Sequence, residues 1–204
     1  MHKMLFHLPA RLETERLVLR PYQAGDGEVY YHLCQNNKKH LLPFEAGNPA
    51  LAVNTLDDAE ILVREYAADW AARNIFFMGA WEKATQALVA QVVVMVINWN
   101  LPEFAVGYFV DKDHQGKGFI TEGVKAALRF SFECLKAQRV RLECNEINVR
   151  SSRVAERCGF VREGFLRQTH SHVRRADGSF SGDYLYGMLR AEYETLYGSL
   201  SAEA

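Results

Sequence analysis

Short runs of apolar residues, some alternating with polar ones, predict β-strands along much of the chain. Residues 16–21 alternate and stop at a proline, which is typical of a first strand. Three runs at 75–81, 88–99 and 104–110 are joined by polar turns and predict an antiparallel meander. The run from Val92 to Ile97 is too β-branched for a helix and too short to span a membrane, so we expect a central strand.

Amphipathic patterns before and after the meander predict helices. Residues 26–36 have the pattern of a first helix. Thr55, with Asp58 three residues later, is expected to cap a second helix that ends near Arg73. A third helix is expected at 121–135, where one face is apolar.

The last third of the chain adds three strand patterns, at 139–145, 165–174 and 184–190. Together the elements favour an α+β fold around a mixed, largely antiparallel sheet. The chain has 204 residues, of which 49% are hydrophobic, and this suits one compact domain with a sizeable core.

Charge and cysteine usage exclude some classes of protein. The formal net charge of −1, without an evident basic face, argues against direct nucleic-acid binding. No apolar stretch approaches the roughly 18 residues of a membrane span, and the first ten residues lack a signal cleavage site, so we expect a cytoplasmic protein. The four cysteines are scattered without metal-ligand spacing, so we predict reduced thiols and no metal site.

The segment 111–121 has the pattern of a turn between a strand and a helix, with Gly116 and Gly118 one residue apart. Glycine permits a positive φ, and the unpaired N–H groups that open a helix can bind a phosphate. A P-loop is excluded because Gly118 follows Lys117, and a dinucleotide fingerprint fits poorly because Thr121 replaces its third glycine. A plain glycine turn remains the alternative.

The pattern Gln-Gly-Lys-Gly at 115–118 resembles the pyrophosphate loop of the GCN5-related N-acetyltransferase (GNAT) superfamily, whose cofactor is acetyl-CoA. The stretch 148–160 resembles the second motif of that superfamily, an Asn-x-x-Ser followed by a short helix that ends in Glu-Arg-x-Gly-Phe. We expect Ser151 or Ser152 to cap this helix and Gly159 to end it. An ordinary capped helix explains each residue, but not the pairing of the two motifs.

The segment 37–45 is similar to a loop of the RimJ/RimL branch, which acetylates the N-termini of ribosomal proteins, with Phe44 in place of tryptophan. The resemblance covers nearly the whole chain and implies a single acyl-CoA N-acyltransferase domain at 1–204. It implies a sheet that is flanked by helices and splayed between its two middle strands. We expect a monomer or a homodimer.

The implied reaction is transfer of an acetyl group from acetyl-CoA to a primary amine, most simply the N-terminal amine of a protein. One alternative is a small-molecule amine acetyltransferase that acts on a polyamine, an amino acid or an antibiotic. Another is a non-catalytic acyl-CoA-binding protein.

The resemblance also implies where the cofactor binds. The pantetheine arm pairs like an extra strand with the backbone of Tyr108, Phe109 and Val110, and an N–H of Phe109 or Val110 binds the thioester oxygen. Asn148 is expected to hold the pantetheine. The residues expected at the pyrophosphate are Gln115, Gly116, Lys117, Gly118, Phe119, Ile120 and Thr121. Ile120 is a departure, since most members have glycine or alanine there.

Attack of a neutral amine on a thioester needs a proton acceptor. Glu143 is the leading candidate, because the branch places its general base five residues before the motif asparagine. A solvated carboxylate paired with Arg141 or Arg139 is equally consistent with the pattern. Glu45 and His170 are further candidates for the base, and with Phe44 they are the residues expected to contact the acceptor.

The proton donor to the departing thiolate is less evident. Many superfamily members have a tyrosine immediately before the glutamate of the second motif, but this position is Ala155. In the RimJ/RimL branch the motif serine contacts the CoA sulfur, which nominates Ser151. Helix capping is the alternative role for Ser151.

Overall fold

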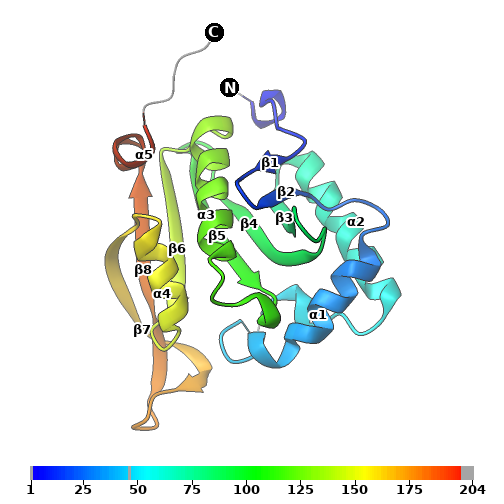
Figure 1. Ribbon diagram of the computed structural model, residues 1–204. Helices are drawn as coiled ribbons and strands as arrows, with labels where there is room; N and C mark the ends of the chain where they lie inside the picture. The colour runs from blue at the N-terminus through cyan, green and yellow to red at the C-terminus, as the bar shows by residue number, and fades with distance from the viewer. Residues whose placement is uncertain (1, 46, 199–204) are drawn as a thin grey trace.

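The computed structural model describes residues 2–45 and 47–198, and only the backbone at 171 and 172. In this part of the chain eight strands form one sheet in the order β1-β2-β3-β4-β5-β6-β8-β7 (Figure 1). Every neighbouring pair is antiparallel except β5 and β6, which are parallel. The strands are β1 (Leu12–Glu13), β2 (Leu17–Pro21), β3 (Ile75–Glu82), β4 (Leu88–Asn98), β5 (Glu103–Val110), β6 (Arg139–Asn145), β7 (Val161–Arg174) and β8 (Phe180–Leu189).

Five α-helices occur in the described residues, and none of them is long and apolar enough to cross a membrane. They are α1 (Gly27–Leu41), α2 (Leu56–Ala72), α3 (Phe119–Arg129), α4 (Val149–Arg157) and α5 (Arg190–Tyr197). The predicted capping box of α2 is present, with Thr55 and Asp58 bonded to each other's backbone N–H groups. Short 3₁₀ turns lie at Lys3–Leu5, Pro49–Leu51 and Lys112–His114.

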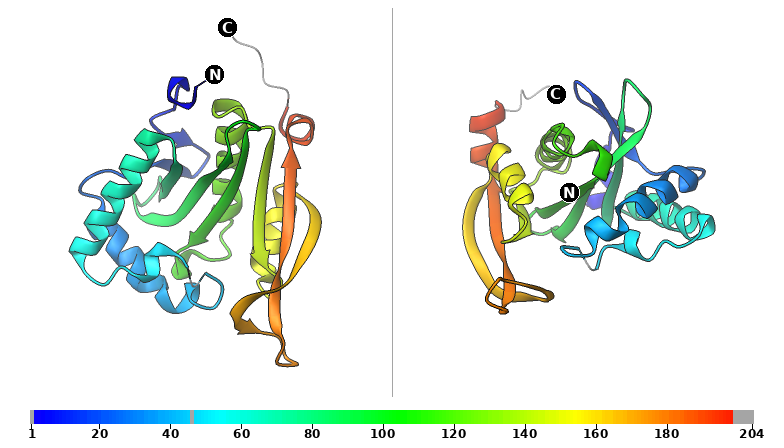
Figure 2. Two further views of the ribbon diagram at one scale, coloured as in Figure 1. Left: turned by 180° about the vertical axis from the view of Figure 1, so that it is seen from behind. Right: turned by 60° about the horizontal axis from the view of Figure 1, so that its bottom comes forward.

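The predicted fold class is confirmed: helices flank a mixed, mostly antiparallel sheet, and β4 lies centrally between β3 and β5. The two faces of the sheet carry separate cores. Phe76 packs into the core that includes α3 and α5, whereas its neighbour Phe77 stacks on Tyr66 of α2 at 3.7 Å. This is the period of two expected for a strand that is covered on both faces. Figure 2 shows α1 and α2 grouped on one side of the sheet and α3 on the other.

The sheet opens between its two middle strands, as the resemblance implied. β5 and β6 are paired only where Glu103–Ala105 lie beside Arg139–Arg141. Beyond this point Val106–Val110 and Leu142–Asn145 have no register with each other, and the strands diverge (Figure 1). Because α3 follows β5 and α4 follows β6, the residues that begin both helices lie near the open end.

Some predicted boundaries were wrong. Residues 37–41, expected in a loop, form the last turn of α1, because buried Asn37 bonds Leu33 O and Asp111. The helix predicted at 121–135 begins at Phe119 and changes to a π-turn at Phe130–Cys134. The short β1 was not predicted, and β7 and β8 both begin four residues before their predicted starts at 165 and 184.

Candidate active site

The glycine turn lies between β5 and α3. Gly116 and Gly118 have φ angles of 75° and 82°, in the left-handed region that favours glycine. Gly118 is the N-cap of α3, so the unpaired N–H groups of the first helical turn lie beside the glycine turn. A Cβ at Gly118 would lie 3.4 Å from Arg16 Nη2, whereas one at Gly116 would meet no atom within 4 Å. The turn can therefore present its N–H groups to a phosphate.

Arg16, just before β2, supports the turn from the protein side. Its Nη1 donates to the carbonyl oxygen of Lys117 at 2.9 Å, and its guanidinium lies 4.7 Å from the centre of the Phe119 ring. Its Nε and Nη2 donate to Glu122 in the first turn of α3 at 2.8 and 2.6 Å. No local pattern predicts this contact, because Arg16 and Glu122 are 106 positions apart.

A large cavity of about 760 Å³ extends from the glycine turn to the open end of the sheet. Its rim carries Arg150, Arg153 and Arg157, whose charges suit a phosphorylated ligand. Of the residues predicted to bind the cofactor, all but Lys117 line it. These are Tyr108, Phe109, Val110, Gln115, Gly116, Gly118, Phe119, Ile120, Thr121 and Asn148.

Two groups of polar contacts support the lining of this large cavity. The side-chain amide of Gln115 contacts Arg150 and, at 2.7 Å, His40 Nε2, and all three residues line the cavity. Behind the lining residue His114, Asn37 Nδ2 donates to Asp111 Oδ1 at 2.9 Å, and Asp111 Oδ2 contacts His114 Nδ1 at 2.9 Å. These bonds join the end of α1 to the segment that precedes the glycine turn.

The splayed end of β5 presents alternate backbone N–H groups to the gap. Asp111 N donates to Val89 O at 2.8 Å, and the β4–β5 register continues without irregularity from Val110 back to Phe104. Since N–H directions alternate along a strand, that of Phe109 also points toward β4. The N–H groups of Tyr108 and Val110 point toward the gap. Of the two N–H groups proposed from the sequence to bind a thioester oxygen, only that of Val110 is suitably directed.

Asn148, not a serine, caps α4. Its Oδ1 accepts a hydrogen bond from Ser151 N at 3.2 Å, and the helix begins at Val149. The prediction that Ser151 or Ser152 is the N-cap was therefore wrong, because the asparagine side chain reaches the N–H group three residues on. Gly159 follows the C-cap with a φ of 78°, as expected for a glycine that ends a helix.

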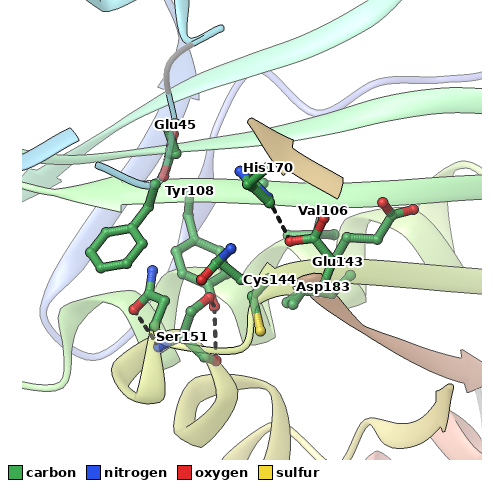
Figure 3. Close-up of a pocket in the computed structure, with 13 residues that line it drawn as sticks. Glu45, Val106, Tyr108, Glu143, Cys144, Ser151, His170 and Asp183 are labelled. Carbon is green, nitrogen blue, oxygen red and sulfur yellow. Dashed lines mark hydrogen bonds and ion pairs between the residues drawn. The ribbon is translucent and has the colours of Figure 1, made fainter. Parts of the chain in front are cut away.

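Ser151 contacts a residue that the sequence did not connect with it. Tyr108 on β5 places its phenolic oxygen 2.8 Å from Ser151 Oγ and 3.3 Å from Ser151 O (Figure 3). Burial raises the pKa of Tyr108 well above its ordinary value, so the phenol stays protonated at neutral pH. A hydroxyl pair therefore lies where the two strands separate.

A smaller cavity of about 320 Å³ adjoins the large one on the side of β6, β7 and β8. Glu143 lines it, with a side chain 43% exposed and 3.7 Å from Arg141 Nε. Glu45 also lines it and accepts a bond from Asn48 Nδ2 at 2.6 Å, while burial raises the pKa of its carboxyl. Phe44 lies beside Glu45 at the cavity wall.

His170 on β7 contacts a carboxyl group in this smaller cavity. Its Nε2 lies 2.7 Å from Asp183 Oδ1 on β8 (Figure 3). Thr169 donates to Asp183 Oδ2 at 2.6 Å. Asp183 was not predicted as a site residue, because it lies one position before the predicted strand 184–190 and in the register of the sheet it stands opposite Leu166, not His170. The carboxylates Glu45, Glu143 and Asp183 give the cavity an acidic lining that suits an ammonium group.

The two cavities share one wall, made by Phe44, Glu45, Tyr108, Asn148 and Ser151. A donor anchored by its phosphate at the glycine turn could extend to this wall and meet an amine that is bound among the carboxylates. The geometry suits transfer of a group from a phosphorylated donor to an amine acceptor, because each reactant reaches the shared wall from its own cavity.

Comparison with known proteins identifies the family. Residues 16–161 match the model of the acetyltransferase (GNAT) domain. The putative ribosomal N-acetyltransferase YdaF of Bacillus subtilis is 32% identical over 183 residues, covering 89% of this chain and 95% of that protein. The spermidine N(1)-acetyltransferase of Vibrio cholerae is 28% identical over 153 residues, covering 75% of this chain and 83% of that protein.

The fold is shared with solved acetyltransferases. RimJ of Mycobacterium smegmatis, in complex with CoA-disulfide, superimposes with a TM-score of 0.75 at 18% identity over 96% of this chain and 97% of that one. The family model covers residues 16–161, which include the glycine turn and both walls of the splayed sheet. This chain therefore belongs to the GNAT acetyltransferases, and it is an acetyl-CoA-dependent N-acetyltransferase.

Proposed function

We propose that this enzyme transfers the acetyl group of acetyl-CoA to the N-terminal amine of a protein. The observation that carries the proposal is the smaller cavity, whose three carboxylates can attract an ammonium group beside the wall shared with the cofactor cavity. The similarity to the putative ribosomal N-acetyltransferase YdaF supports a protein acceptor. Acetyl-CoA and newly made proteins are both present in the cytoplasm, where we expect the enzyme to act.

In this proposal the large cavity holds acetyl-CoA. The pyrophosphate lies on the N–H groups from Gln115 to Thr121, and the arginines of the rim neutralise the phosphates. The Val110 N–H stabilises the charge that develops on the thioester oxygen. Asn148 lies in the wall that the pantetheine passes.

Glu143 is the proposed general base, directly or through a water. It lines the acceptor cavity, and its exposed carboxylate can pass a proton to solvent. His170, which contacts Asp183, is the alternative base, because a neutral imidazole oriented by a carboxylate can accept a proton. Phe44 and Glu45 are proposed to contact the acceptor chain.

A polyamine acceptor is the second candidate. The relative in Vibrio cholerae is a spermidine N(1)-acetyltransferase, and three carboxylates in one cavity suit a molecule with several ammonium groups as well as a single N-terminus. An acceptor screen with acetyl-CoA should decide between them. It would compare peptides that begin with serine or alanine, the same peptides with blocked N-termini, and spermidine, and would detect released CoA thiol.

The blocked peptides are the matched control, since they retain every side chain and lack only the α-amine. Acetylation of free but not blocked peptides is the expected result. Turnover with spermidine and none with any peptide would replace the proposed acceptor by a small molecule.

A further inference from the structure

The wall shared by the two cavities fixes where the reacting thioester must lie. The acetyl group has to be reached by the donor from the glycine-turn side and by the amine from the acidic side, so it lies against residues common to both cavities. Among these described residues, hydroxyl groups are carried by Tyr108 and Ser151. Ala155, one turn after Ser151 in α4, is buried and has no side-chain proton to donate.

The contacts of Asn148 and Tyr108 limit the hydrogen bonds that the Ser151 hydroxyl can make. Asn148 Oδ1 caps α4, so the Ser151 hydroxyl is not used for capping. Ser151 Oγ lies 2.8 Å from the phenolic oxygen of Tyr108, which comes from the opposite strand of the gap. A serine hydroxyl has a single proton and two acceptor positions. When Tyr108 donates to Oγ, the proton of Ser151 remains for an acceptor in the shared wall.

The resemblance already assigns the motif serine, Ser151, to the sulfur of CoA, and we propose that Tyr108 is the residue that orients the Ser151 hydroxyl toward that sulfur as a hydrogen-bond donor. The proposal rests on acetyl-CoA being the donor, but not on which amine is the acceptor. Ser151 touches the reacting sulfur, whereas Tyr108 acts through Ser151 and is a positioning residue.

The charges in the step balance without a further reactant. The amine nitrogen forms the C–N bond and loses a proton to the base on the acceptor side, while the C–S bond breaks with its electron pair on sulfur. The thiolate accepts the Ser151 hydrogen bond and takes its proton from solvent. Full proton transfer from Tyr108 is unfavourable, because burial raises the pKa of this phenol above the ~8.5 of a free thiol.

The direct test measures the thiol pKa of CoA bound to the enzyme, from the ultraviolet absorbance of the thiolate and with no acceptor present. The complex with desulfo-CoA provides the background from the four cysteines of the chain. A hydrogen bond to the thiolate lowers the pKa of bound CoA. We expect that pKa to rise by about one unit in both Ser151→Ala and Tyr108→Phe, a tenfold change in the ionisation equilibrium. The double variant should give no further rise, because Tyr108 acts through Ser151.

Two control variants separate this role from a structural one. Ser152→Ala removes the neighbouring hydroxyl, which lines neither cavity. Tyr22→Phe removes another buried phenol, bonded to Gln91 at 3.1 Å in the core beneath α1. Both should leave the thiol pKa unchanged. Circular dichroism and calorimetry should show that all the variants are folded and bind CoA.

Steady-state kinetics give a second readout. Tyr108→Phe and Ser151→Ala should each lower kcat about tenfold with little change in the KM for acetyl-CoA, since the hydrogen bond forms fully only with the thiolate. An unchanged thiol pKa in folded Tyr108→Phe, or effects of the two substitutions that add in the double variant, would overturn the proposal. The measurement on bound CoA is independent of the acceptor. Failure of every peptide as a substrate with the pKa shift intact would refute only the proposed acceptor.

Discussion

Replacing Glu122 by glutamine should weaken both the fold and the cofactor site. One carboxylate oxygen accepts from Thr14 Oγ1 at 2.5 Å and Arg16 N at 2.8 Å, and the other accepts from the Arg16 guanidinium. A hydrogen bond to a charged group contributes about 1.5–3 kcal/mol, and an amide would turn N–H groups toward those of Arg16. Because Arg16 is 43% exposed, we discount the sum and expect Glu122→Gln to cost about 2–3 kcal/mol.

The loss should appear in two assays. A change of this size in a chain of 204 residues lowers Tm by about 5–10 °C, measured by differential scanning calorimetry. Arg16 also donates to Lys117 O, so its displacement should loosen the glycine turn and raise the Kd of acetyl-CoA about threefold to tenfold, measured by isothermal titration calorimetry. As a control, Glu194→Gln removes an exposed ion pair at 3.6 Å and should change the unfolding free energy by less than about 0.5 kcal/mol.

The pH dependence provides a further check on Glu122. Burial acts to raise the pKa of this carboxyl, but hydrogen bonds from Thr14 and Arg16 outweigh it and hold the folded-state pKa below its ordinary value. The contribution is therefore complete above the unfolded-state pKa of about 4.3 and is lost as pH falls through the folded-state pKa. The stability gap between the wild type and Glu122→Gln should be constant from about pH 5.5 to 8 and narrow below about pH 4. A gap that widens on acidification would refute the assignment.

Three further substitutions test the candidate site. Gly118→Val should raise the Kd of acetyl-CoA more than tenfold by calorimetry, whereas Gly178→Val, at a similar φ of 84° in the β7–β8 turn, should share the backbone cost and keep the Kd. Glu143→Gln should lower kcat about a hundredfold, with the loss easing as pH rises and more of the amine is neutral; a wild-type rate at neutral pH would assign the base to another residue. Asp183→Asn, which alters the contact with His170, should lower kcat or raise the KM of the acceptor while the KM of acetyl-CoA stays unchanged. A change in the KM of acetyl-CoA with unchanged kcat and acceptor KM would contradict a role for this pair on the acceptor side.

The parts of the site that lie close together in sequence were predictable. The glycine turn and the Asn148 motif are local patterns, and the positive φ angles of Gly116, Gly118 and Gly159 follow from a few neighbouring residues. The central position of β4 could also be predicted, because its run from Val92 to Ile97 is apolar and β-branched. Local patterns were therefore sufficient for the fold class and the glycine turn, whereas the splay of the sheet was implied by the resemblance.

Contacts between distant segments were not predictable in the same way. The Tyr108–Ser151 bond depends on how far β5 and β6 separate, and the His170–Asp183 pair depends on irregular register between Leu166 and His170 in β7. A shift of one residue in that register would turn the His170 side chain to the other face of the sheet. The cap of α4 was assigned to a serine instead of Asn148 because asparagine and serine are both favoured at the N-cap, and sequence alone does not rank them.

The short pairing of β5 with β6 makes the stability of this enzyme depend on its own substrate. Backbone N–H groups such as those of Tyr108 and Val110 are left by the divergence without a neighbouring strand. A ligand that binds only the folded chain stabilises it by about 2.7 kcal/mol at a hundred times its Kd. Amide hydrogen exchange at the open end should therefore slow in proportion to the acetyl-CoA concentration. Between product release and the next binding event the protein passes through its least stable state, so starvation for acetyl-CoA would shorten its lifetime as well as its activity.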